Sequence, residues 1–136
     1  MHKTSDLRIS GRQEVISASS LLDKQPISDT SSKTVFNSRK EFSEILSKKD
    51  KRLAVVVGPC SIHDTESALE YANLLLKEKK ALEKELLIVM RVYFEKPRTT
   101  VGWKGLINDP DLDNSFNIDK GLSVSRQLLR DINDLG

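Results

Sequence analysis

The fold is decided by residues 86–105, which read LLIVMRVYFEKPRTTVGWKG. The first five of these residues are apolar and uncharged, a pattern that predicts a β-strand buried on both faces. A similar apolar run, LAVVV, occupies residues 53–57, and its β-branched side chains also favour a buried strand. The sequence therefore predicts two buried strands, the second of which runs into a charged loop.

Helices are predicted around these strands. Apolar residues at helical spacing indicate a helix from about Thr34, a second helix that Asp64 or Thr65 caps, and a third from about Asp119. Gly136 suits the C′ position of the last helix. Strands that alternate with helices imply parallel pairing through a right-handed crossover, so the predicted fold class is α/β.

Two parallel strands alone leave the edges of a sheet exposed, and the chain ends after a helix, where a further strand is expected. We therefore expect residues 34–136 to be part of a larger (β/α) protein. Residues 1–33 are rich in Ser, Thr, Asp and Lys, a composition that cannot make a core alone. They are predicted to form an N-terminal arm with one short helix.

The composition argues against several classes of protein. Lys and Arg number 22 and Asp and Glu number 20, whereas nucleic-acid binding requires a strong basic excess on one face. No apolar run approaches the roughly 18–20 residues of a membrane span, and the N-terminus lacks the apolar core of a signal peptide. Because Cys60 is the single cysteine, an internal disulfide is impossible. We expect a cytoplasmic protein without nucleic-acid or membrane partners.

Cations gather directly after the second strand and are opposed there by a single acid, Glu95. Guanidinium groups bind carboxylate and phosphate in a bidentate fork, and an ammonium group adds a point charge. The sequence therefore predicts a site for a phosphorylated, acidic substrate. The cations are Arg91, Lys96, Arg98 and Lys104.

The alternative is a solvated basic loop, since charged residues are mostly exposed. Neighbouring residues favour the site instead. Pro97 fixes the backbone beside Lys96 and Arg98, and Thr99 adds a hydroxyl donor. Trp103 is the only tryptophan, and so large an aromatic side chain favours an anchored loop.

Cys60 lies in the segment GPCSIHD at residues 58–64, where the first strand ends. In parallel α/β folds this end of the sheet carries the active site. Cys60 has three interpretations: a nucleophile, a metal ligand or a small buried hydrophobic residue. His63 is three residues away, but the two residues supply at most two of the three or four ligands that a metal requires.

Residues 58–64 and 90–110, read together, closely resemble the type I 3-deoxy-D-arabino-heptulosonate 7-phosphate (DAHP) synthases. These enzymes are also named phospho-2-dehydro-3-deoxyheptonate aldolases, and the likeness is to their feedback-regulated branch. The resemblance implies a (β/α)₈ barrel with an N-terminal extension. Residues 34–136 would then hold its first two βα units. It also implies the condensation of phosphoenolpyruvate with D-erythrose 4-phosphate, the first step of the shikimate pathway.

Carried over position by position, the resemblance implies a role for six residues. Cys60 would be a ligand of a divalent metal, and a thiolate is compatible with Mn, Fe, Zn or Co. Arg91 and Lys96 would be catalytic residues: Arg91 would bind phosphoenolpyruvate, and Lys96 would lie between the two substrates. Pro97, Arg98 and Thr99 would belong to the segment that holds the phosphate of erythrose 4-phosphate.

The arm carries a further resemblance at Asp6 and Leu7. In the family this segment reaches a neighbouring subunit and helps to form the site of an aromatic amino-acid inhibitor. The likeness implies a homo-oligomer, and the first eight residues favour tryptophan slightly over phenylalanine or tyrosine as the effector. The alternative is a disordered polar tail.

Two other functions compete with the synthase. A non-catalytic fragment could bind phosphate-bearing metabolites or regulate without turnover. A related synthase of 8-phosphate sugar acids is the second, and the intact segment at residues 96–99 argues against it. The remaining metal ligands of the family would lie beyond Gly136, so the resemblance implies that these 136 residues alone are inactive.

Overall fold

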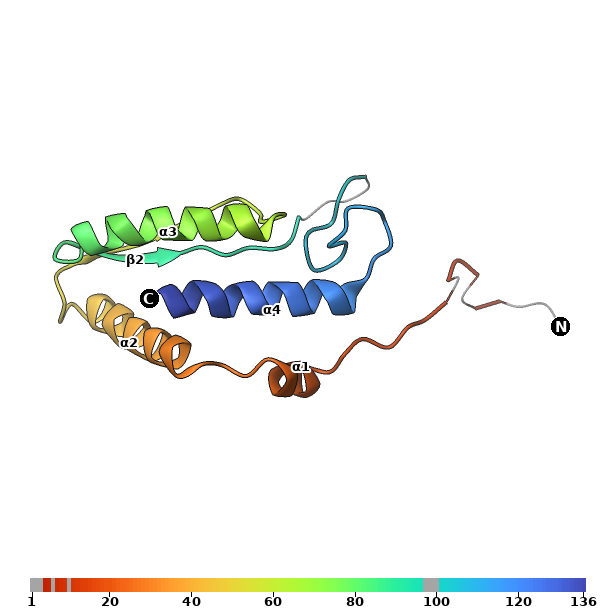
Figure 1. The fold of residues 1–136 in the computed structure, drawn as a ribbon, viewed down its shortest axis with the longest axis horizontal. Coiled ribbons are helices and arrows are strands. Elements are labelled where there is room, and N and C mark those ends of the chain that lie inside the picture. The colour runs from red at the N-terminus through yellow and green to blue at the C-terminus, as the bar shows by residue number, and fades with distance from the viewer. Residues whose placement is uncertain (1–3, 6, 10, 97–100) are drawn as a thin grey trace.

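The computed structural model describes residues 4–5, 7–9, 11–96 and 101–136 (Figure 1). Within these residues, four helices and two strands follow one another in an order that confirms the predicted α/β class. They are α1 (Ala18–Lys24), α2 (Asp29–Leu46), β1 (Leu53–Val57), α3 (Thr65–Ala81), β2 (Leu86–Met90) and α4 (Ile118–Leu135).

The two strands pair in parallel and in register, from Leu53 opposite Leu86 to Val57 opposite Met90. Parallel pairing requires a crossover connection, and α3 supplies it. Helix α4 contacts α3 on one side and α2 on the other, so it lies between them in Figure 1. No helix in the described part of the chain is long and apolar enough to span a membrane.

Side chains at the ends of the helices determine where each helix begins. Asp64 accepts hydrogen bonds from the backbone N–H groups of Glu66 and Ser67 at 3.2 and 3.0 Å, so it is the cap of α3. Hydrogen bonding to Ser67 lowers the pKa of Asp64 from its ordinary value. Asn117 caps α4 by accepting from the N–H of Lys120 at 3.1 Å.

Helix α2 begins at Asp29, and the prediction of a start near Thr34 was wrong. Ser28 accepts from the N–H of Ser31 at 2.9 Å and caps a first turn that is entirely polar. Apolar spacing therefore indicates only the later turns of this helix. The predicted division of the chain after residue 33 falls within α2 and stays a prediction.

The exposure of β1 corrects a second expectation. Leu53 is 65% exposed and Val56 58%, although the apolar run predicted a buried strand. In this two-stranded sheet, β1 has a partner on one edge only. Leu87 and Ile88 in β2 are buried, as predicted.

The main core cluster forms where the loops that follow the two strands meet α3 and α4. Leu128 of α4 is 1% exposed and belongs to a cluster of five buried apolar side chains. Trp103 packs against this cluster, so the loop after β2 is anchored in the core. The five are Ile62, Ala68, Phe94, Leu106 and Leu128.

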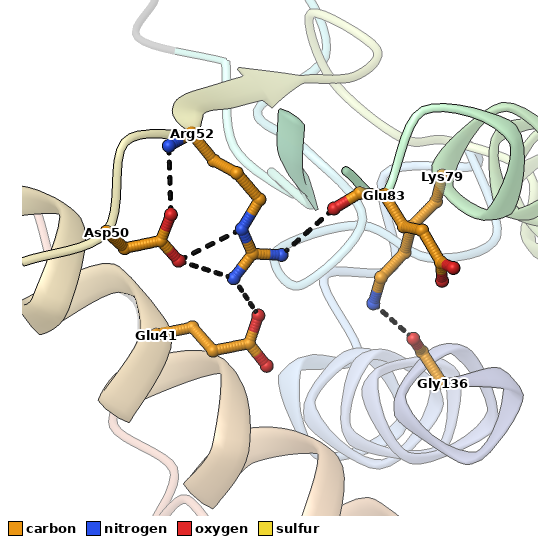
Figure 2. A network of polar contacts seen from close by, with 6 residues as sticks. All are labelled: Glu41, Asp50, Arg52, Lys79, Glu83 and Gly136. Carbon is orange, nitrogen blue, oxygen red and sulfur yellow. Dashed lines mark hydrogen bonds and ion pairs between the residues drawn. The ribbon is translucent and has the colours of Figure 1, made fainter. Parts of the chain in front are cut away.

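An ionic network joins Arg52, the residue before β1, to α2 (Figure 2). The guanidinium group of Arg52 donates to Asp50 at 2.7 and 3.0 Å, to Glu41 at 2.6 Å and to the carbonyl of Glu83 at 3.3 Å. Hydrogen bonding to Arg52 lowers the pKa of Asp50, and hydrogen bonding to Asp50 raises the pKa of Arg52. Lys79 donates to the backbone carbonyl of Gly136 at the end of α4, as the same figure shows.

A turn region precedes α4 and contains three residues in the left-handed conformation. Leu112, Asn114 and Phe116 have φ angles of 59°, 63° and 52°. Asn adopts this conformation readily, but for bulky side chains it is uncommon and strained. Asp109, which is buried, accepts from the N–H of Asn114 at 3.1 Å and holds the turn.

We predict that Gly121→Ala destabilises the chain although alanine is the better helix former. A Cβ at this position of α4 would lie 2.1 Å from the carbonyl oxygen of Ile107, and neither backbone can give way cheaply. Overpacking of this kind lowers the free energy of unfolding by about 1–3 kcal/mol. Urea unfolding followed by Trp103 fluorescence measures the change.

Gly11→Ala is the matched control, because a Cβ at Gly11 meets no atom within 4 Å. Its unfolding midpoint should stay at that of the parent chain. Equal midpoints for Gly121→Ala and the parent would contradict the close contact between α4 and Ile107.

Asp134 provides a second prediction, on pH dependence. Its carboxylate accepts from Ser28 and, at 2.7 Å, from the hydroxyl of the buried Ser31. Hydrogen bonding to Ser28 and then to Ser31 lowers the pKa of Asp134 from its ordinary value of 3.8. Because the folded pKa is the lower one, the stabilisation is complete above the unfolded pKa and is lost as the pH falls through the folded pKa.

Asp134→Asn should therefore reduce stability at pH 7 and flatten the fall in stability below about pH 4. Urea unfolding at pH 7, 5 and 3 checks this. Asp23→Asn, at an exposed carboxylate on α1, should leave the profile of the parent. If the stability of Asp134→Asn fell with pH as steeply as that of the parent, the hydrogen bonds of Asp134 to Ser28 and Ser31 would not be a source of acid sensitivity.

Candidate active site

The parallel pairing brings the two predicted site segments together at one edge of the sheet. The N–H of Arg91 donates to the carbonyl of Val57 at 2.8 Å, which extends the pairing one residue past the strands. The N–H of Ile62 then donates to the carbonyl of Tyr93 at 2.8 Å. The loop after β1 and the chain after β2 therefore run side by side.

Gly58 makes this close approach feasible. A Cβ at Gly58 would lie 2.2 Å from the carbonyl oxygen of Arg91, a distance that no side chain can adopt. Only glycine lets the two backbones meet here. The close approach of the two backbones thus explains the glycine of the segment GPCSIHD without any role for Gly58 in catalysis or binding.

Arg91 reaches from β2 across to the loop after β1. Its Nη1 donates to the carbonyl of Pro59 at 2.6 Å and to the carbonyl of Cys60 at 2.9 Å. Its Cζ lies 4.5 Å from the centroid of the Tyr93 ring. These contacts hold the guanidinium group over the start of the loop that carries Cys60.

Lys96 contacts the side chain of Cys60. Its Nζ lies 3.5 Å from Cys60 Sγ, which is within the range of a hydrogen bond to sulfur. The Cys60 side chain is exposed, so its interpretation as a buried hydrophobic residue was wrong. Of the predicted site residues, Cys60, Arg91 and Lys96 are thus gathered in one place.

Residues 95–96 pair with residues 104–105. The N–H of Lys96 donates to the carbonyl of Lys104 at 3.0 Å, and Glu95 and Gly105 form an antiparallel bridge. Trp103 Nε1 donates to the carbonyl of Asp109 at 2.7 Å and fixes the chain next to Lys104. The predicted site residues Pro97, Arg98 and Thr99 lie between these paired residues in the sequence but outside the described residues.

The other predicted groups contribute less. His63 is exposed and makes an edge-to-face contact with Trp103 at 6.5 Å between ring centroids. The described residues contain no cluster of three or more His, Cys, Asp or Glu side chains that could hold a metal. Cys60 therefore fits a metal as one ligand only. Asp6 lies outside the described residues, and Leu7 is 70% exposed.

Tyr93 and the carbonyls of Pro59 and Cys60 also belong to this site, although the sequence did not predict them. The signal for Tyr93 was its spacing from Arg91, because residues two apart in extended chain share a face. The carbonyls carry no sequence signal, since backbone groups are common to all residues.

Fold and site together define an α/β protein with cations at the carboxyl ends of parallel strands, the edge where this class binds its ligands. Residues 24–133 match the model of the DAHP synthetase I family. The chain belongs to this family.

Its relatives include enzymes with different sensitivities. The chain is 55% identical over 135 residues to the Phe-sensitive phospho-2-dehydro-3-deoxyheptonate aldolase of Escherichia coli, covering 99% of the chain and 39% of the relative. It is 50% identical to the Trp-sensitive enzyme of Enterobacter agglomerans, covering 100% of the chain and 39% of the relative. It is 49% identical to the tyrosine-inhibited enzyme of Schizosaccharomyces pombe, covering 96% and 35%.

A solved structure, that of phospho-2-dehydro-3-deoxyheptonate aldolase from Francisella tularensis, superposes with a TM-score of 0.88. The two sequences are 55% identical, and the match covers 93% of this chain and 37% of that one. The chain thus spans less than two-fifths of the length of these relatives.

We predict that Cys60 reacts with a thiol reagent such as dithiobis-nitrobenzoate in native buffer, because its side chain is exposed. One equivalent of thiol should be released without denaturant, at a rate close to that in urea. Cys60→Ser should release none, since the chain has no other cysteine. Reaction only after unfolding would contradict the exposed position of the sulfur.

Proposed function

We propose that this chain supplies part of the active site of a DAHP synthase, which condenses phosphoenolpyruvate with D-erythrose 4-phosphate and releases phosphate. The observation that carries the proposal is the meeting of Lys96 Nζ with Cys60 Sγ at 3.5 Å, beside Arg91, where two parallel strands end. Membership of the family and the names of the relatives support it.

The charges on the substrates fit this arrangement. Phosphoenolpyruvate carries a carboxylate and a phosphate, and erythrose 4-phosphate carries a second phosphate. Arg91 uses Nη1 for backbone carbonyls, and its Nε and Nη2 have no hydrogen bond to another described residue. These donors remain for the carboxylate or phosphate of phosphoenolpyruvate.

Lys96 would stand between the two substrates, near the phosphate of one and the aldehyde of the other. Pro97, Arg98 and Thr99 would hold the phosphate of erythrose 4-phosphate, as the resemblance implies. The cations would hold two anions together against their repulsion, which is catalysis by proximity. The methylene carbon of phosphoenolpyruvate attacks the aldehyde carbon, water adds to the former enol carbon, and phosphate leaves.

Cys60 would be one ligand of a divalent metal, with the other ligands outside the described residues. When bound, such a metal would act as a Lewis acid toward the aldehyde oxygen. A thiolate accepts Mn, Fe, Zn or Co, so the donor does not select among them.

We also propose the larger architecture that the family implies, a (β/α)₈ barrel in which β1, α3, β2 and α4 are the first two units. An aromatic amino acid would act as effector, with Asp6 and Leu7 contributing from the arm of a neighbouring subunit in a homo-oligomer. The sensitivities named for the relatives support an aromatic effector, and the preference for tryptophan rests only on the first eight residues. A cytoplasmic location fits a chain with a single free thiol.

The test is a chimeric enzyme in which this chain replaces the matching segment of the Francisella tularensis relative. The chimera should form DAHP, measured by phosphate release and by detection of the product. Arg91→Ala and Lys96→Ala should each lower kcat/KM by about 10²-fold or more, the range for removal of a charge-stabilising donor. The 136-residue chain alone should show no turnover.

Lys40→Ala, at an exposed lysine on α2, is the control and should retain the activity of the chimera. A chimera that is folded by circular dichroism and binds phosphoenolpyruvate without forming DAHP would favour the non-catalytic alternative. Full activity of Lys96→Ala would remove Lys96 from the chemistry.

A further inference from the structure

The side chain of Arg91 has one face covered by an aromatic ring. Arg91 Cζ lies 4.5 Å from the centroid of the Tyr93 ring, a distance at which the ring attracts a cation. Tyr93 is 37% exposed, so one face of the ring is taken by the guanidinium group while part of the side chain remains open to solvent.

The backbone that carries the Tyr93 ring is fixed by its contacts. The carbonyl of Tyr93 accepts from the N–H of Ile62 at 2.8 Å, and Ile62 belongs to the buried core. The next residue, Phe94, is buried in the same cluster. The backbone of Tyr93 is therefore held at its carbonyl and at the following residue, and its ring can support the guanidinium group.

The hydrogen bonds of Arg91 do not by themselves stop its guanidinium group from tilting, whereas a ring against its face does. Both carbonyls that Arg91 contacts are bound by the same nitrogen, Nη1. A guanidinium group held at one corner can still swing about that corner. A ring against its face limits motion out of the guanidinium plane, and the two hydrogen bonds of Nη1 limit rotation within the plane, so that Nε and Nη2 keep one direction.

We propose that Tyr93 is a positioning residue for the anionic substrate, acting through Arg91: its ring holds the guanidinium plane so that the two uncommitted nitrogens face the carboxylate or phosphate. The substrate part of this inference rests on the proposed function. The aromatic face is the active feature, and the hydroxyl group is not required. Tyr93→Phe should therefore behave as the parent, whereas Tyr93→Leu removes the support.

The first experiment measures the mobility of Arg91 in the 136-residue chain and needs no catalysis. The ¹⁵N heteronuclear NOE of the Arg91 Nε–H group at pH 6 should be high in the parent chain and in Tyr93→Phe. It should fall clearly in Tyr93→Leu. Tyr71→Leu, at the only other tyrosine and on α3, is the matched control and should leave the NOE unchanged.

The second experiment measures steady-state kinetics in the chimeric enzyme. Tyr93→Leu should raise the KM for phosphoenolpyruvate about 2- to 5-fold, the factor that corresponds to loss of an exposed cation–π contact. The KM for erythrose 4-phosphate and kcat should change little. Tyr93→Phe should restore the KM of the parent.

The outcomes separate the two proposals. An unchanged NOE in Tyr93→Leu, or an unchanged KM for phosphoenolpyruvate, overturns the positioning role. Loss of kcat in both Tyr93 variants also overturns it, because the hydroxyl group would then act in the chemistry. A chimera that is inactive in every form defeats the proposed function, while the NOE still decides whether Tyr93 holds Arg91.

Discussion

Parallel, in-register pairing of β1 with β2 is the constraint on which the site depends. Because Val57 lies opposite Met90, both strands end at the same edge of the sheet and their following loops emerge together. A shift of one residue would turn every side chain of a strand to the other face. Arg91 would then point away from the carbonyls of Pro59 and Cys60, and the three gathered side chains would separate.

The same pairing explains why side chains are buried to different extents in different parts of the structure. The core gathers where the loops beyond the strands meet α3 and α4, and there Leu128 and Ile62 are nearly inaccessible. Strand β1 is covered less well than β2, and it presents Leu53 and Val56 to solvent. In the proposed barrel, neighbouring strands and helices would cover these side chains.

The strands were predictable because their signal is local. The apolar runs 53–57 and 86–90 match β1 and β2 residue for residue, and Asp119 lies one residue after the observed start of α4. The start of α2 was missed because the Ser28 cap precedes a polar turn that carries no apolar spacing. The exposure of β1 depends on which elements cover it, and no property of its own residues encodes that.

The candidate site divides in the same way. Charge and residue type in the sequence predict Cys60, Arg91 and Lys96 as site residues. Their convergence depends on the strand register and on Gly58, which are properties of the pairing. The hydrogen bonds of Arg91 to two carbonyls have no counterpart in a motif, because they join segments about 30 residues apart in the chain. Its contact with Tyr93 is local and follows from their spacing of two residues.

The alternating left-handed residues before α4 reverse an ordinary rule about loops. Glycine usually loosens a connecting segment, because it enlarges the unfolded ensemble. At Leu112 and Phe116 the backbone already occupies a region that side chains resist. Glycine or asparagine at these two places would relieve the resistance, and valine or isoleucine would worsen it. Neutral drift in this turn should therefore favour small or amide side chains, even though the turn is held by a buried carboxylate and leads directly into a long helix.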